Sequence, residues 1–265
     1  MKIESIHNER IKRVRRLYTR RMRARTGLTV IEGIRLIEEA LHCAVEVEDA
    51  FFAPELLPGQ ADRSLLRSLE RVMGRAPVQV PASILRLLAD TEHPQGIVAV
   101  IRIPKENDWR DALLNGSRML LLDRLQDPTN LGTVLRSALS FDIDALFCLH
   151  GTADVFAPKV LRGSMGAAFR LQIHQQIDYR ELRPLFQERP LCRIASVVKE
   201  GAHPKDMPWH EPWLLALGNE AAGLHEEILA DCGHRVTIPM PGGMESLNVA
   251  MAATILLYES QRNGS

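Results

Sequence analysis

The sequence predicts an α/β protein whose C-terminal part contains a parallel or mostly parallel sheet. Short apolar and β-branched runs alternate with stretches whose apolar residues recur at helical spacing along most of the 265 residues. Some of these runs, such as residues 119–122 and 145–149, are apolar at every position, which is typical of strands buried on both faces. Alternating strands and helices of this kind form layered α/β folds.

The first hundred residues predict a small α/β domain. An apolar stripe surrounded by arginines predicts one helix over residues 6–25. The pattern then predicts, in order, a strand at 28–31, a helix at 34–41, a strand at 45–53, a helix at 61–73, a short strand at 78–80, a helix through Leu88 that Ser83 caps, and a buried strand at 96–103. We expect the polar residues 104–116 to link this domain, residues 1–103, to a second domain, residues 117–265.

The second domain is expected to begin with a buried strand at 119–122. After it the pattern predicts a turn at 127–130, a helix at 131–140, a strand at 145–149, a helix at 158–169, strands at 194–198 and 214–217, an apolar stub containing Val236 and Ile238, and a helix at 249–258. Five strand-like runs with helices between them predict a sheet that is covered on both faces.

Composition excludes several classes of function. No run of eighteen apolar residues and no signal peptide is visible, so we expect a cytoplasmic protein without a membrane partner. The four cysteines lie far apart, without a CxxC pair or a histidine at ligand spacing, so we expect no metal site. A GxGxxG loop after an early strand is also lacking, which argues against a dinucleotide-binding fold.

The net charge of zero hides an uneven distribution of charge. Nine of the 33 basic residues lie in residues 10–25, where there is no acidic residue, so the rest of the chain has 24 basic and 33 acidic residues. Nine cations repel one another unless something neutralises them, so we expect this segment to contact RNA phosphates through Arg13, Arg16, Arg20 and Arg23. A solvated surface helix and a membrane-surface helix are the alternatives, and the second lacks apolar aromatic residues.

Two loops near the C-terminus combine glycines with polar side chains. Residues 215–224 read LALGNEAAGL, and residues 238–248 read IPMPGGMESLN. Each loop follows an apolar run, and ligands of open α/β sheets bind at the carboxyl ends of strands. Either loop alone could be an ordinary turn, since Gly and Pro are frequent in turns.

Four polar residues of the second domain could have a structural role in place of a role in a site. Arg136 suits a phosphate or a surface ion pair, and it is poor as a base. Glu220 suits a helix N-terminus. Ser246 and Asn248 would face one cavity if the chain there is extended, whereas Ser246 would cap a helix if the helix has already begun.

The two loops, together with residues 120–138 (LLLDRLQDPTNLGTVLRSA), resemble the three ordered motifs of the SpoU/TrmH family of RNA ribose 2′-O-methyltransferases. The family belongs to the SPOUT class, so the resemblance implies a C-terminal sheet with a trefoil knot. The segments IEGIRLIEEAL and TEHPQGIVAV are similar to the substrate-binding domain that precedes the catalytic domain in this family. That domain is related in fold to ribosomal proteins that bind RNA.

The resemblance implies methyl transfer from S-adenosylmethionine to a ribose 2′-hydroxyl of RNA, and it favours 23S-type ribosomal RNA. Methylation of transfer RNA is an alternative, as is a non-catalytic RNA-binding or ribosome-assembly factor. The catalytic residues implied by the motifs are Arg136, Asn130, Glu220, Ser246 and Asn248. The implied cofactor contacts are Gly218, Ile238, Leu247, Asn219 and Met240. In the family the helix at 249–258 buries its outer face against a second subunit, so the resemblance also implies a homodimer.

Overall fold

The structure is a computed structural model that describes residues 2–57, 59–210 and 212–263. The chain forms two compact units. The first contains residues 1–104 and 156–169, and the second contains residues 105–155 and 170–265.

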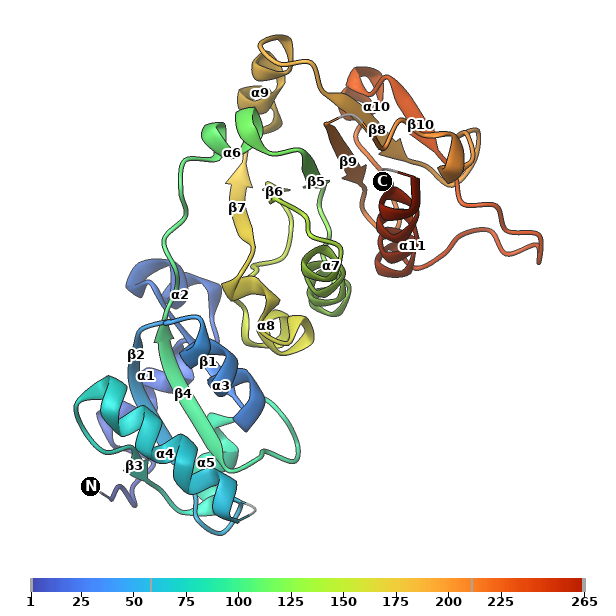
Figure 1. Cartoon of the computed structure of the whole chain (residues 1–265). Helices are drawn as coiled ribbons and strands as arrows, with labels where there is room; N and C mark the ends of the chain where they lie inside the picture. The colour runs from blue at the N-terminus through green and yellow to red at the C-terminus, as the bar shows by residue number, and fades with distance from the viewer. Residues whose placement is uncertain (1, 58, 211, 264–265) are drawn as a thin grey trace. The chain divides into compact units, whose positions relative to one another are not determined.

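The first unit is built on a four-stranded sheet with the strand order β1-β4-β2-β3 (Figure 1). β4 lies between β1 and β2 and runs antiparallel to both, whereas β3 pairs parallel with β2. The strands are β1 Leu28–Glu32, β2 Val47–Phe52, β3 Val78–Gln79 and β4 Ile97–Arg102, and the helices are α1 Glu9–Arg16, α2 Arg20–Thr26, α3 Ile34–His42, α4 Gln60–Met73 and α5 Ala82–Leu88.

Helix α1 belongs to the core of the first unit. Its residues Ile11 and Val14 are buried and pack in one cluster with Ile84 and Leu85 of α5. The segment that contains helix α8 (Pro158–Ser164) also packs on this unit. It is held by a hydrogen bond from Thr29 Oγ1 to the Phe156 carbonyl at 2.7 Å.

Two predictions for the first unit are wrong in detail. The single helix predicted over residues 6–25 is two helices, α1 and α2, because the chain leaves helical geometry between them and Thr19 is extended. Ser83 does not cap α5. The N-cap is Pro81, and Ser83 lies in the first turn of the helix.

The second unit contains a six-stranded sheet in which every neighbouring pair is parallel, as predicted. Its strand order is β10-β8-β9-β5-β6-β7. The strands are β5 Arg118–Leu122, β6 Ala145–Leu149, β7 Gln172–Ile177, β8 Cys192–Ser196, β9 Trp213–Leu217 and β10 His234–Val236. All residues of β6 and β9 are buried, so the middle of the sheet is covered on both faces.

Helices cover the two faces of this sheet (Figure 1). α6 (Trp109–Asn115), α9 (Tyr179–Leu182) and α10 (Glu226–Asp231) contribute to a core cluster with β5 and β6 on one face. α7 (Pro128–Ser140) and α11 (Val249–Asn263) lie together on the other. They are joined by a 2.7 Å contact between the hydroxyls of Ser137 and Thr254.

Residues 117–265, the predicted second domain, depart from the predicted pattern in several places. Helix α7 begins at Pro128, so the residues predicted to form a turn are its first turn. The helix predicted over 158–169 ends at Ser164, because Met165 and Gly166 both have positive φ, and only a short 3₁₀ turn, Ala167–Phe169, follows. Strand β7 was not predicted. No helix in the described part of the chain is both long and apolar enough to cross a membrane, and the trefoil knot stays a prediction.

Candidate active site

The carboxyl ends of four neighbouring strands of the second unit surround one cavity. Strands β5, β8, β9 and β10 each lead into a loop that lines it, and the cavity measures about 610 Å³. Its lining residues come from the three motif segments and from the loop after β8. This volume lies within the range of small-molecule and cofactor sites, and the position is where parallel sheets bind ligands.

The first wall of the cavity is the start of α7. Asp127 is the N-cap, and its Oδ1 accepts a 2.7 Å hydrogen bond from Thr129 N. Pro128 at the first helical position has its fixed φ already suited to a helix. These two residues start the helix early enough to bring the buried Asn130 to the cavity in the first turn.

Asn130 joins the three motifs. Its Nδ2 donates to Glu220 Oε1 at 3.1 Å, and its Oδ1 accepts from Asn248 Nδ2 at 2.8 Å. Asn248 is itself fixed, because its Oδ1 accepts from Ala250 N at 2.9 Å at the start of α11. Three side chains far apart in the sequence therefore form one hydrogen-bonded chain along the cavity wall.

The second wall is the loop of residues 218–224. Asn219 N donates to Gly223 O at 3.0 Å, Gly223 N donates back to Asn219 O at 2.9 Å, and Asn219 Oδ1 accepts from Ala221 N and Ala222 N. A Cβ on Gly218 would lie 2.4 Å from backbone atoms of Gly223 and Leu224. Gly218 and Asn219 both line the cavity, but the glycine is required by the loop's own backbone and not only by a ligand.

The third wall is the segment that leads into α11. Ile238, Met240, Ser246 and Leu247 all line the cavity. The chain is not helical until Val249, which is the condition under which Ser246 and Asn248 were expected to serve a site. The alternative, that Ser246 caps the helix, is wrong, because Asn248 accepts the hydrogen bonds from the first turn of α11.

Arg136 is the one predicted catalytic residue that does not line the cavity. It lies on the exposed side of α7 and forms no ion pair with any described residue. The remaining four, Asn130, Glu220, Ser246 and Asn248, are brought together.

Sequence reasoning missed part of the lining. Ser196, Val197 and Val198 line the cavity from the end of β8, as does Gln126 from the loop after β5. The strand predicted at 194–198 ends at Ser196, so Val197 and Val198 belong to the loop after it, where parallel sheets bind ligands. Within the described residues, no group of three or more His, Cys, Asp or Glu side chains could hold a metal ion.

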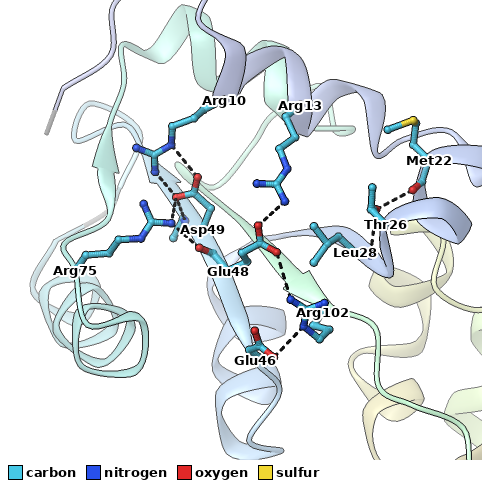
Figure 2. Close-up of polar contacts among 11 residues, drawn as sticks. Arg10, Arg13, Met22, Thr26, Leu28, Glu46, Glu48, Asp49, Arg75 and Arg102 are labelled. Atoms are coloured by element: carbon cyan, nitrogen blue, oxygen red, sulfur yellow. Dashed lines mark hydrogen bonds and ion pairs between the residues drawn. The ribbon is translucent and has the colours of Figure 1, made fainter.

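The basic segment of the first unit is partly neutralised, as Figure 2 shows. Arg10 Nε donates to Asp49 Oδ2 at 2.9 Å, and Arg13 forms an ion pair with Glu48. Both carboxylates lie on β2, where Arg75 and Arg102 also contact the acidic residues. Acids from another part of the sequence therefore balance part of the charge that the local sequence left unbalanced.

The nine basic residues differ sharply in exposure. Arg23 is only 4% exposed, and its NH1 donates to the carbonyls of Leu17 and Tyr18, both at 2.9 Å. Its prediction as an RNA contact is therefore wrong, since the guanidinium stabilises the break between α1 and α2. Five others are exposed and pair with no described carboxylate, namely Arg15, Arg16, Arg20, Arg21 and Arg25.

The fold and the cavity together define an α/β protein with a ligand site at the carboxyl end of a parallel sheet. Residues 117–258 match the model of the SpoU rRNA methylase family, and residues 8–99 match that of the MRM3-like substrate binding domain. The chain belongs to the SpoU rRNA methylase family.

Two relatives and one solved structure are similar over almost the whole chain. The 23S rRNA (guanosine(2553)-2′-O)-methyltransferase RlmP of Bacillus subtilis is 32% identical, with 97% of each chain covered. The 23S rRNA (uridine(2479)-2′-O)-methyltransferase of Streptomyces viridochromogenes is 30% identical, with 93% of this chain and 86% of the relative covered. The crystal structure of the SpoU methyltransferase AviRb from that organism, in complex with the cofactor AdoMet, matches with a TM-score of 0.82 and 28% identity over 96% of this chain and 98% of the other.

Proposed function

We propose that this protein transfers the methyl group of S-adenosylmethionine to a ribose 2′-hydroxyl of 23S-type ribosomal RNA. The observation that carries the proposal is the hydrogen-bonded chain of Asn130, Glu220 and Asn248, which unites the three family motifs at one cavity. Membership of the SpoU rRNA methylase family and the similarity to two named 23S rRNA 2′-O-methyltransferases support it. The enzyme would act in the cytoplasm, on RNA of the ribosome.

The cavity suits S-adenosylmethionine in size and in lining. Backbone groups of Gly218 and Asn219 and the side chains of Ile238, Met240 and Leu247 would hold the cofactor. Its sulfonium supplies an already activated methyl group, so the protein needs to provide orientation and a place for the hydroxyl proton, and no metal.

The remaining polar residues of the cavity would orient the ribose. Glu220 accepts from Asn130 Nδ2 at 3.1 Å, from Asp127 N at 3.5 Å and from Asn219 Nδ2 at 3.4 Å. An ionised carboxylate has about four acceptor positions, so Glu220 retains capacity for a hydrogen bond from the 2′-hydroxyl. Ser246 and Asn248 line the same wall and would contact the ribose beside it.

We propose the domain roles and the dimer on the same basis. The first unit would bind RNA, and the second unit would form the knotted methyltransferase domain. Residues 104–116, expected as a linker, contain α6, which packs in the core of the second unit, and residues 156–169 belong to the first unit. Helix α11 exposes Met251 (61%), Ile255 and Tyr258 (51%) at a spacing that places them on one side. A symmetric dimer would bury this apolar stripe, with the same surface contributed by both copies.

In the proposed dimer Arg136 would act across the interface. It does not line the cavity of its own chain, and its neighbour Ser137 contacts α11 through Thr254. Its guanidinium would orient an RNA phosphate and offset negative charge that develops at the reacting oxygen.

The first experiment tests the activity itself. Purified protein is incubated with methyl-labelled S-adenosylmethionine and total bulk RNA, and 2′-O-methyl groups are mapped in ribosomal and transfer RNA from a deletion strain. We expect one 23S-type position to lose its methyl group in the strain, and the Asn248→Ala variant to give no label. Label in transfer RNA alone, or in no RNA, would contradict the proposal.

The second experiment tests Arg136. We expect Arg136→Ala to abolish transfer and to leave the affinity for S-adenosylmethionine unchanged by calorimetry. Mixing and refolding this variant with Asn248→Ala should restore activity that neither variant has alone, because a mixed dimer contains one complete site. A large loss of cofactor affinity in Arg136→Ala would refute its assignment to RNA, and failure of the mixture would refute action across the interface.

A further inference from the structure

The cavity loop of residues 218–224 is a closed unit whose position must be set from outside. Its backbone pairs with itself through Asn219 and Gly223, and the Asn219 side chain holds the tip. A loop bonded mainly to itself keeps its shape wherever it lies. The groups at its two ends therefore decide where its cavity-lining atoms are.

Asp123 holds both ends of this loop. Its backbone N–H donates to Leu217 O at 2.9 Å, just before the loop begins. Its Oδ2 accepts from His225 N at 2.9 Å, and its Oδ1 lies 2.9 Å from His225 Nδ1, just after the loop ends. Asp123 directly follows β5, and its side chain is 1% exposed, so this anchor belongs to the rigid sheet.

Arg124 completes the attachment from the other side of the carboxylate. Its Nε and NH2 donate to the two oxygens of Asp123 at 2.9 and 3.1 Å, and NH2 lies 3.3 Å from Gly223 O inside the loop. Its own carbonyl accepts from Asn219 Nδ2 at 2.9 Å. Arg124 has a positive φ of 55°, an uncommon conformation for a non-glycine residue, and it carries the side chain back over Asp123.

Burial of a carboxylate destabilises the folded protein unless hydrogen-bond donors surround it. The donors to Asp123 come from Arg124 and His225, which both contact or adjoin the loop of residues 218–224. Asp123, Arg124 and His225 do not line the cavity themselves. We infer that Asp123, through Arg124 and His225, is the positioning residue that fixes the loop of residues 218–224 against the cavity and so sets the affinity for the methyl donor. The inference rests on the proposed function, because the donor is taken to be S-adenosylmethionine.

The test compares two isosteric changes of carboxylates in the same unit. Asp123→Asn removes the charge and turns one acceptor into a donor facing N–H groups. Asp231→Asn is the matched control, because Asp231 also accepts from an arginine and another side chain, Arg183 and Tyr179, and does not line the cavity. Calorimetry gives the Kd of S-adenosylmethionine, and methyl transfer to RNA gives KM and kcat.

We expect Asp123→Asn to raise the Kd and KM for S-adenosylmethionine about tenfold or more, which corresponds to about 1.4 kcal/mol. The kcat at saturating donor should change far less, and Asp231→Asn should leave the Kd unchanged. Arg124→Asn provides a second variant if Asp123→Asn does not fold. Asparagine tolerates the left-handed backbone but is too short to reach Asp123 and Gly223, so the Kd should rise in the same direction.

The outcomes distinguish a failure of the proposed function from a failure of the positioning role. If the wild type binds no S-adenosylmethionine, the proposed function is wrong and this inference falls with it. If the wild type binds and both variants at positions 123 and 124 bind equally well, the proposed function stands and the positioning role is wrong. A loss of kcat without a change in Kd would also refute it, since the loop would then serve the reaction and not the affinity.

Discussion

The cavity of the second unit and the basic helices of the first unit position their polar side chains in different ways. At the cavity, Asn130 lies between Glu220 and Asn248 in directional hydrogen bonds of 3.1 and 2.8 Å. On α1 and α2, some arginines pair with carboxylates of β2, whereas Arg16 and Arg20 are exposed without such a partner. The cavity fixes the positions of individual polar atoms, whereas helices α1 and α2 present charged side chains to solvent.

This difference indicates which properties each region depends on. Hydrogen bonds between neutral amides and a carboxylate depend on the identity and orientation of single atoms. Exposed charges act over a Debye length of about 10 Å at 0.1 M salt, so they tolerate imprecise geometry but respond to salt. We therefore expect single isosteric changes to abolish function at the cavity, and only multiple changes to matter on the helices.

Among the changes that test this comparison, Asn130→Asp is expected to have the largest effect. The change keeps the shape of the side chain but replaces the donor to Glu220 by an oxygen. Two carboxylates would then face each other and repel. Removal of one preorganised oxyanion-hole donor lowers kcat by about 100-fold to 1000-fold, and we expect a loss of this order here. The measurement is methyl transfer at saturating RNA and S-adenosylmethionine.

Asn115→Asp is the matched control for that change. Asn115 is an exposed amide at the end of α6, and its Nδ2 donates to the Asp111 carbonyl. It should retain wild-type activity. Nearly normal activity of Asn130→Asp would show that the hydrogen-bonded chain at the cavity is not needed for the reaction.

The second prediction concerns the exposed arginines. Neutralising Arg15, Arg16, Arg20 and Arg21 as glutamines should flatten the dependence of log K on log salt concentration for RNA by about three units, because each phosphate contact contributes about 0.7 to 0.9. A double change of Arg10 and Arg13 to glutamine is the control, since β2 already neutralises both. Equal flattening in the two variants would remove the distinction between exposed and paired arginines.

Much of the second unit could be predicted because its strands are uniformly apolar. β6 has the predicted bounds, and β5 and β9 begin within one residue of them. β7 was missed because its sequence QIHQQI is mostly polar. It lies at the edge of the sheet, where a strand has a single neighbour and less of its surface is buried.

The candidate site was predictable as far as the motifs reach. Nine of the ten proposed catalytic and cofactor residues line the cavity, and the exception is Arg136. The attachment of the loop by Asp123, Arg124 and His225 was not predictable, because it depends on contacts between residues about one hundred positions apart. Sequence spacing cannot reveal such contacts.

Arg23 shows the same limit for surface charge. On one continuous helix, Arg13, Arg16, Arg20 and Arg23 would share a side, since residues three and four apart are neighbours. The break after α1 changes the direction of the chain, and Arg23 turns inward to the carbonyls of Leu17 and Tyr18. The sequence offered no glycine or proline at the break that would have indicated it.

A third region, around His174, contains a buried polar side chain that has no hydrogen-bond partner among the described residues. His174 on β7 is 1% exposed, and neither ring nitrogen has a hydrogen-bond partner among the described residues. Its ring stacks on Phe147 with centroids 5.6 Å apart. Burial lowers the pKa of His174 below its usual value, although the carboxylate of Asp108 acts in the opposite direction.

The smallest effect is therefore a pH dependence of stability. Below about pH 6.5 the unfolded chain binds a proton at this histidine that the folded protein does not, so stability should fall as pH decreases toward the lower folded pKa. Above that pH both states are neutral and the contribution vanishes.

His174→Phe tests this prediction, because it keeps an aromatic ring against Phe147 and removes the titration. Between pH 7.5 and 5 its melting temperature should fall less than that of the wild type. The difference should be about 2–4 °C for each kcal/mol of this linkage. His234→Phe, at an exposed histidine of the same unit, should follow the wild type. Parallel curves for wild type and His174→Phe in thermal unfolding would show that His174 binds protons equally in the folded and unfolded states.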